Sequence, residues 1–185
     1  MDIFTAFGLS FSAGLNAYIP LLILSLLAKF TDLIKLDPPW DTLTNWWVIG
    51  ALVFLSLIEF FADKIPAVNH INDAVQTIIR PAAGAIVFAA TASVADIHPV
   101  LAMVAGLLVA GGVHATKSAA VRPAVTATTG GAGNVPVSIF EDIVSTVVSF
   151  FSIIIPIIVA VVVAILILLV VWWLWRRANR EIGDG

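Results

Sequence analysis

Hydrophobic residues in this chain of 185 residues occur in long runs that are separated by short polar segments. Each run is close to the length of a membrane-spanning helix, because roughly 20 residues at 1.5 Å rise cross a hydrocarbon core of about 30 Å. The predicted runs are residues 3–28, 45–63, 81–95, 99–116, 138–154 and 156–175. The pattern predicts an all-α membrane protein, a single domain over residues 1–185, with about six transmembrane helices in three hairpins.

Residues 67–79 follow a different pattern, in which polar and apolar side chains alternate at helical spacing. The apolar positions are Val68, Ile71, Val75, Ile78 and Ile79, and the polar positions are Asn69, His70, Asn72, Asp73, Gln76 and Thr77. Such a segment predicts a helix that lies in the membrane interface.

Small residues mark one hairpin as a site of close packing. Ala102, Gly106 and Ala110 recur at every fourth position, and this spacing lets two helix backbones approach each other in a membrane. We therefore expect the hairpin of residues 81–116 to be central. The run over 156–175 is bulky and ends in tryptophan and arginine residues, which predicts contact with lipid or with a second subunit.

Basic residues are distributed unevenly between the connections, and their distribution predicts the topology. One side collects Lys64, Arg80, Lys117, Arg122, Arg176, Arg177 and Arg180, whereas the other keeps Lys29 and Lys35. With six spans, this distribution predicts both termini in the cytoplasm and segments 32–44 and 96–98 outside. The N-terminus lacks a cationic signal region, so we expect the first run to be retained.

Composition supports the bilayer as the main partner, because the chain is 61% hydrophobic and 11% charged. The net charge of -3, without a basic stripe, argues against a nucleic-acid partner. The chain contains no cysteine, which excludes disulfides, thiolate metal sites and a cysteine nucleophile. The sequence contains neither the histidine spacing of a metalloenzyme nor the G-x-S-x-G motif of a nucleophile elbow. No cofactor is predicted, and the sequence leaves open whether a metal ion binds.

Glu59 and Asp63 are the first candidates for a functional site. They are four residues apart on a helix, hence on one face, at the end of a run beside Lys64. Two such carboxylates could bind a divalent cation or share a proton. Alternatively, they pair with Lys64, Lys117 or Arg80 and fix the helix ends.

Asn16 and Tyr18 are candidates within the first run, where Gly14 and Pro20 flank them. Polar residues beside glycine and proline in the middle of a span are typical of a broken helix, which membranes tolerate where it is buried or lines a cavity. Asn16 and Tyr18 either line such a cavity or bond to neighbouring helices.

His114 and Lys117 are three residues apart at the end of the fourth run. They could meet an anionic group or the carboxylates of Glu59 and Asp63; alternatively, Lys117 extends to the surface and His114 is hydrogen-bonded. Glu141 and Asp142 are expected in the first turn of the fifth helix, where carboxylates favour the positive helix end.

Four segments resemble a known family. They are residues 59–66 (EFFADKIP), 73–85 (DAVQTIIRPAAGA), 112–119 (GVHATKSA) and 138–144 (SIFEDIV). Together they resemble the bacterial domain-of-unknown-function family 4126, and the resemblance extends over nearly the whole chain. It implies a small polytopic inner-membrane protein without an assigned biochemical activity.

Three functions fit these observations. A channel or secondary transporter for a small ion or solute is favoured by the broken first helix and the paired carboxylates. A non-catalytic scaffold or assembly subunit within a membrane complex is favoured by the bulky last helix. A lipid-processing enzyme would use His114, Lys117, Arg80 and Arg122 to hold a headgroup phosphate. Of these three functions, the enzyme is not the one that we favour.

Overall fold

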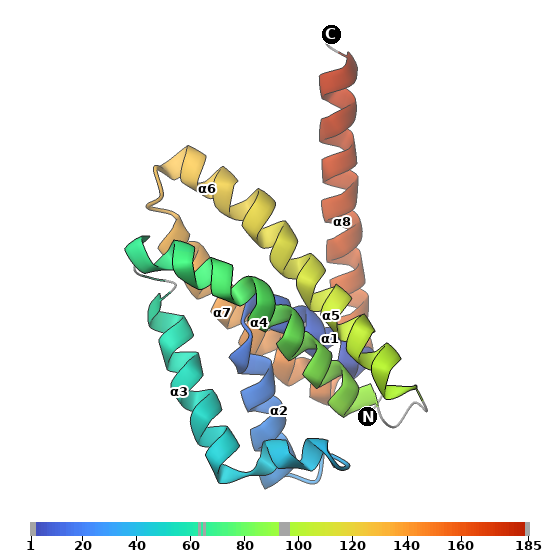
Figure 1. Ribbon diagram of the computed structural model, residues 1–185. Coiled ribbons are helices and arrows are strands. Elements are labelled where there is room, and N and C mark those ends of the chain that lie inside the picture. Colours follow the sequence, from blue (N-terminus) through green and yellow to red (C-terminus); the bar gives the residue numbers. More distant parts are fainter. Residues whose placement is uncertain (1–2, 63, 65, 93–96, 184–185) are drawn as a thin grey trace.

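The computed structural model describes residues 3–62, 64, 66–92 and 97–183, and these residues form helices joined by short connections. The elements are α1 (Ile3–Leu15), α2 (Tyr18–Phe30), the 3-10 helix η1 (Trp40–Thr44), α3 (Trp46–Ala62), α4 (Pro66–Ala92), α5 (Pro99–Thr116), the π-helical η3 (Lys117–Val121), α6 (Arg122–Thr129), α7 (Asn134–Ile154) and α8 (Pro156–Gly183). Figure 1 shows their arrangement. The predicted all-α class is confirmed for the described residues.

Four helical segments are long and apolar enough to cross a membrane: Ala74–Ala92, Pro99–Thr129, Asn134–Ile154 and Pro156–Trp173. Helices α1, α2 and α3 are apolar but shorter. These features identify a multi-pass membrane protein.

The first predicted span, residues 3–28, is not one helix but two helices of 13 residues each. Phe7 of α1 contacts the Phe88 ring of α4, and Phe30 at the end of α2 contacts Trp46 at the start of α3. Trp40 of η1 packs against a cluster that contains Ala6 and Phe88. The start of α1 and the end of α2 therefore lie at the same end of the bundle, and we call this pair the α1–α2 hairpin (Figure 1).

This hairpin changes the expected topology. Helix α1 begins at the end of the bundle that carries η1, whereas α8 extends beyond the opposite end (Figure 1). The structure thus places the described ends of the chain at opposite ends of the bundle, whereas the charge distribution predicted both termini on one side.

Single cysteines can test this arrangement, because the wild-type chain has none. We expect cysteines at Phe4 and Asp37, which are both exposed, to react with an impermeant reagent from the same side of the membrane. A cysteine at Thr128, exposed at the other end of the bundle, should react from the opposite side. Labelling of position 4 together with position 128, and apart from position 37, would contradict the hairpin.

The predicted interfacial helix over 67–79 is the first half of α4, which continues through Pro81 to Ala92 without a break. Among its described side chains Gln76 is buried, whereas Val75, Thr77 and Ile78 are exposed. The apolar residues Val75 and Ile78 thus face outward, an orientation that suits a helix surrounded by lipid.

Helices α4 and α5 pack closely, as the spacing of small residues predicted. A Cβ atom on Gly84 would lie only 2.7 Å from the carbonyl oxygen of Gly106, and a Cβ on Gly106 would lie 2.6 Å from the Cβ of Phe88. Ala102 and Ala110 are buried on the same face of α5. The backbones can meet at this point because neither glycine has a side chain.

Helix α8 has the exposed surface that was predicted for the last run. Its described side chains from Ile157 to Trp175 are exposed or half-buried, and the helix extends beyond the rest of the bundle (Figure 1). The guanidinium of Arg176 stacks over the Trp172 ring at 5.0 Å. A tryptophan and arginine pair at a helix end is typical of a membrane interface.

Candidate functional site

The break between α1 and α2 is organised by the side chain of Asn16. Its Oδ1 atom accepts hydrogen bonds from the backbone N–H groups of Tyr18 and Ile19, both at 3.1 Å. These bonds satisfy N–H groups that have no partner in the first turn of α2. Pro20, also in that turn, needs no such partner. Asn16 Nδ2 donates to Asp142 Oδ1 of α7 at 3.0 Å, so the break is tied to another helix.

Two charged side chains bond to the backbone on either side of the break. The Lys117 ammonium donates to the carbonyl oxygen of Leu15 at 3.4 Å. The N–H group of Ala17 donates to Glu59 Oε1 at 3.5 Å. Residues 15–18, which we call the hairpin tip, therefore obtain from side chains the partners that an unbroken helix would provide.

The same side chains belong to a set of buried ion pairs. Arg80 Nη2 lies 2.9 Å from Glu59 Oε1, and both side chains are at most 1% exposed. Lys117 Nζ lies 2.5 Å from Glu141 Oε2, and Arg122 Nη2 lies 4.0 Å from that oxygen. We call these five side chains, with Lys64, Asp142 and His114, the charge network.

Lys64 and Asp142 form the outer part of this network. Lys64 Nζ lies 3.1 Å from Asp142 Oδ2, and their side chains are 16% and 13% exposed. Asp142 thus accepts from Asn16 with one oxygen and from Lys64 with the other. The hairpin tip is joined in this way to α7 and to the segment that follows α3.

His114 connects the network to α4. Its Nδ1 atom lies 3.3 Å from Arg80 Nη1, and its Nε2 atom lies 3.2 Å from Thr77 Oγ1. A guanidinium can only donate, so Nδ1 must accept and the neutral ring carries its proton on Nε2. His114 therefore acts as a neutral partner of Arg80 in this arrangement.

The network lies inside the expected depth of the hydrocarbon. Glu59 comes 13 residues after the start of α3, and Glu141 comes 13 residues before the end of α7. At 1.5 Å per residue each distance is about 20 Å, compared with about 30 Å for the hydrocarbon core. Ionisable groups at such depth are costly unless they are paired, and they mark functional sites in membrane proteins.

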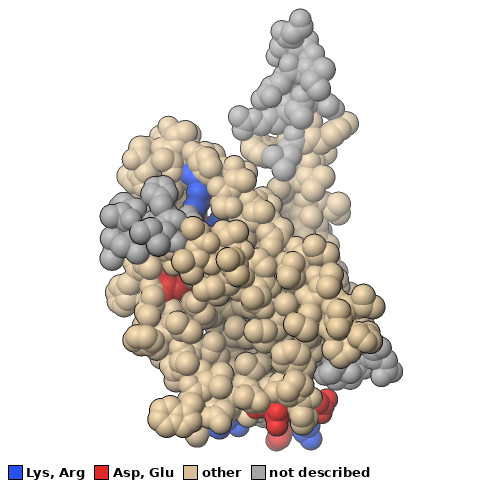
Figure 2. Space-filling model, viewed as in Figure 1, with Lys and Arg blue, Asp and Glu red and all other residues tan. Residues whose placement is uncertain are grey.

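Figure 2 shows how little of this charge reaches the displayed surface. Most of that face is uncharged, and charged atoms gather at the end of the bundle near η1. Further basic atoms lie in a hollow beside α6. The distribution agrees with a body that is surrounded by lipid along its length.

The structure shows the surroundings of the predicted site residues that it describes. Glu59 pairs with Arg80, one of the three partners that the pairing alternative named. Asp63, its predicted neighbour in the site, lies outside the described residues. Among the described residues, no group of three histidine, aspartate or glutamate side chains is arranged to hold a metal ion.

Asn16 and Tyr18 occur at the break, as predicted, and the Tyr18 N–H group donates to Asn16 Oδ1. Lys117 does not extend to the surface, because it is 3% exposed and pairs with Glu141. His114 is hydrogen-bonded, and Arg80 links it to Glu59.

The prediction for Glu141 and Asp142 was wrong. Helix α7 begins at Asn134, so both carboxylates lie well beyond its first turn. They pair with Lys117 and Lys64 instead of acting at the helix end.

Sequence reasoning missed a row of serines on α7. Ser138, Ser145, Ser149 and Ser152 share one buried face with Glu141. Ser12 of α1 lies within 2.7 Å of the hydroxyl groups of Ser145 and Ser149. The signal was present, because these serines together with Glu141 recur every three or four positions in an otherwise bulky run, which indicates the inward face of a helix.

Comparison with known proteins gives one result. The model of a family described as Domain of unknown function (DUF4126) matches residues 3–177. No curated protein and no solved structure matches the chain.

Proposed function

This chain belongs to the family described as Domain of unknown function (DUF4126), and we propose its function from the site: a channel or secondary transporter that moves a small ion or solute past the hairpin tip. One observation carries the proposal. At hydrocarbon depth, the carbonyl of Leu15 and the N–H of Ala17 are bonded by Lys117 and Glu59 instead of by helix backbone.

Broken helices of this kind are characteristic of transporter binding sites. Their free backbone groups coordinate ions or polar groups of a substrate near the middle of the membrane. Irregular backbone is tolerated there only where it is buried in protein or faces a cavity. The α1–α2 hairpin provides such a break, and the charge network surrounds it.

Burial sets a condition on the proposed transport. Asn16, Glu59 and Lys117 are at most 3% exposed, so a solute reaches the tip only when helices around it separate. During that step a polar solute would replace Glu59 or Lys117 as a partner of the backbone at the break. When one polar partner replaces another, the backbone N–H and C=O groups at the break stay hydrogen-bonded. The surrounding hydrocarbon offers them few other donors or acceptors.

Orientation is part of the same proposal. Arg176, Arg177 and Arg180 belong to the last turns of α8, whereas Lys29 bonds to Thr44 at the other end of the bundle. The positive-inside rule then favours an orientation across an inner membrane with the end of α8 in the cytoplasm and the start of α1 outside.

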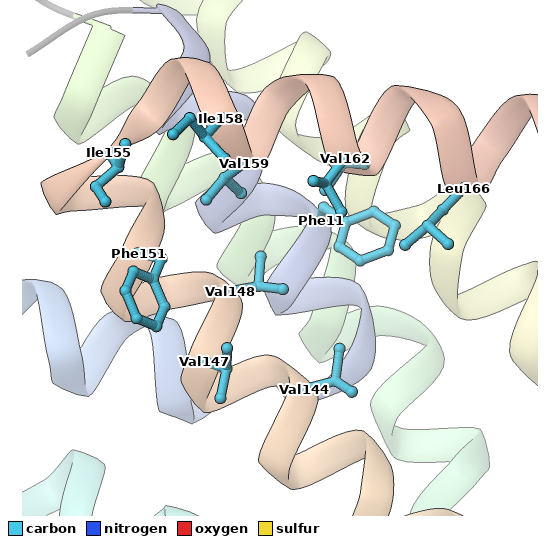
Figure 3. Close-up of a pocket in the computed structure, with 11 residues that line it drawn as sticks. Phe11, Val144, Val147, Val148, Phe151, Ile155, Ile158, Val159, Val162 and Leu166 are labelled. Carbon is cyan, nitrogen blue, oxygen red and sulfur yellow. The ribbon is translucent and has the colours of Figure 1, made fainter.

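A scaffold role is the second candidate, and the surface of α8 favours it. An apolar groove of about 240 Å³ lies between α7 and α8, with Phe11 of α1 at its base (Figure 3). A helix of a second copy of this chain would find an apolar surface there. A lipid-processing role receives less support, because Arg80, Lys117 and Arg122 each lie near a carboxylate.

The effect of Asn16→Leu tests the transport proposal. We expect flux of the transported solute in liposomes to fall at least about tenfold, because leucine removes the cap of α2 and the bond to Asp142. Asn45→Leu is the matched control, since Asn45 also caps a helix start through Trp47 but lies exposed, far from the network. Equal flux in both variants would place the path elsewhere.

A further inference from the structure

The helical run from Pro99 to Thr129 changes its register in the middle. The π-helical η3 joins α5 to α6 without a gap, and in it the N–H group of Arg122 donates to the carbonyl oxygen of Lys117. This bond spans five residues, whereas the bonds of an α-helix span four. The run therefore holds one residue more at η3 than an α-helix would. Such turns inside α-helices are frequent at functional sites.

Pro123, which directly follows η3, favours this wider turn. Proline has no N–H group, and in an α-helix its ring clashes with the carbonyl group four residues earlier, here that of Ala119. A wider turn moves that carbonyl away from the ring. Proline alone does not impose the turn, since α4 passes through Pro81 as an α-helix.

The turn at η3 places two basic side chains on one side of the run. In an α-helix, residues five apart point about 140° away from each other, because each residue turns the chain by about 100°. Here Lys117 and Arg122 are both buried, whereas Ala119, Ala120 and Val121 between them are exposed. An α-helical register would turn Arg122 away from the buried side.

Glu141 of α7 receives both of these cations. Lys117 Nζ lies 2.5 Å from Glu141 Oε2, and Arg122 Nη2 lies 4.0 Å from the same oxygen. Arg122 is the outer of the two, because its side chain is 10% exposed and that of Lys117 is 3% exposed. Arg122 therefore covers a buried ion pair on the side of α6.

The far end of α6 allows this short helix to turn. Helix α6 has eight residues and ends at Gly130, where the backbone is left-handed. Gly130 and Gly131 have φ angles of 63° and 91°, which glycine adopts without steric cost. A change of register at η3 would rotate α6 by about 100°, and this connection can take up the rotation.

We infer that η3 is a hinge that holds Arg122 over the pair of Lys117 and Glu141. When the additional residue leaves η3 and moves along α6, Arg122 turns away from Glu141 and the charge network opens on the side of α6. The use of this opening as an entry for solute rests on the proposed function. The hinge itself depends on the helix register and on the ion pair alone.

Cysteine reactivity at position 138 measures the opening. Ser138 is 1% exposed, and it lies three residues before Glu141 on the same buried face of α7. Ser138→Cys in the otherwise unchanged chain should react slowly with a water-soluble maleimide. Deletion of Ala120 removes the additional residue from η3. We expect this deletion to raise the rate at position 138 at least about fivefold, because labelling follows the population of open states.

Deletion of Ala124 is the matched control. It also removes an exposed alanine from the same helical run, but it lies beyond Arg122 and leaves η3 intact. This variant should keep the slow rate. Arg122→Gln should raise the rate by itself and add little to the deletion of Ala120, because both changes act through the same side chain.

A point substitution tests the hinge if the deletion of Ala120 does not fold. Pro123→Ala removes the clash that favours the wide turn, so the rate at position 138 should again rise. A fast rate without any second change, equal rates in the two deletion variants, an additive effect of Arg122→Gln or an unchanged rate in Pro123→Ala would each overturn the inference. Failure of the transport proposal would not alter these rates, because labelling detects access and not flux.

Discussion

Glu59→Gln should lower the free energy of unfolding by about 3–5 kcal/mol, because it removes the buried carboxylate that Arg80 contacts at 2.9 Å. The guanidinium would remain inside the bundle beside the neutral His114. Chemical or thermal denaturation in detergent measures the change. Asp41→Asn, a similar change at an exposed position of η1, should alter stability by less than about 0.5 kcal/mol.

Variants of Glu59 also distinguish a structural ion pair with Arg80 from a cation-binding site. If Glu59 and Arg80 mainly satisfy each other, Glu59→Gln with Arg80→Gln should recover part of the stability that Glu59→Gln loses. The melting temperature of the wild type should then not depend on Mg²⁺, Ca²⁺ or Na⁺. A rise with one of these cations, lost in Glu59→Gln, would show that the carboxylate binds the cation instead, since ligands stabilise the state that they bind.

Gly106→Leu should destabilise the protein by about 3 kcal/mol or more, because its side chain would occupy the space of Gly84 and Phe88. The obstacle includes backbone atoms of α4, which cannot rotate away as a side chain can. Helices α4 and α5 would have to separate along their contact.

Gly112→Leu is the matched control for this change. Gly112 lies on the same helix, and a Cβ there would meet no atom within 4 Å. Thermal denaturation of both variants in detergent should therefore show a loss for Gly106→Leu and little change for Gly112→Leu. Equal stability of the two variants would contradict the observed packing of α4 against α5.

The break in the first run could be predicted from the sequence, but its geometry could not. Asn16 and Pro20 interrupt an apolar run, and a polar group at that depth needs a partner. The run is nevertheless long enough for one span, so sequence alone suggested that the chain continues in the same direction. The return of α2 depends on contacts between distant residues, such as Phe30 with Trp46 and Asn16 with Asp142.

Ion-pair partners were harder to predict than the ionisable residues themselves. Glu59 was expected to pair with Lys64, Lys117 or Arg80, and the structure selects Arg80 among these through the approach of α4 to α3. The start of α7 at Asn134 similarly moved Glu141 away from a helix end and toward Lys117. In contrast, the close packing at Gly106 was predictable, because small residues at every fourth position have few other uses in a membrane helix.

Flux through purified wild-type protein tests the central proposal most directly. Liposomes containing the folded protein would be compared with empty liposomes for movement of protons, common cations, common anions and small polar solutes. The proposal predicts at least one flux above that of empty liposomes, and the same flux should fall with Asn16→Leu. If folded wild-type protein moves none of them faster than empty liposomes do, the transport proposal is contradicted and the scaffold role is favoured.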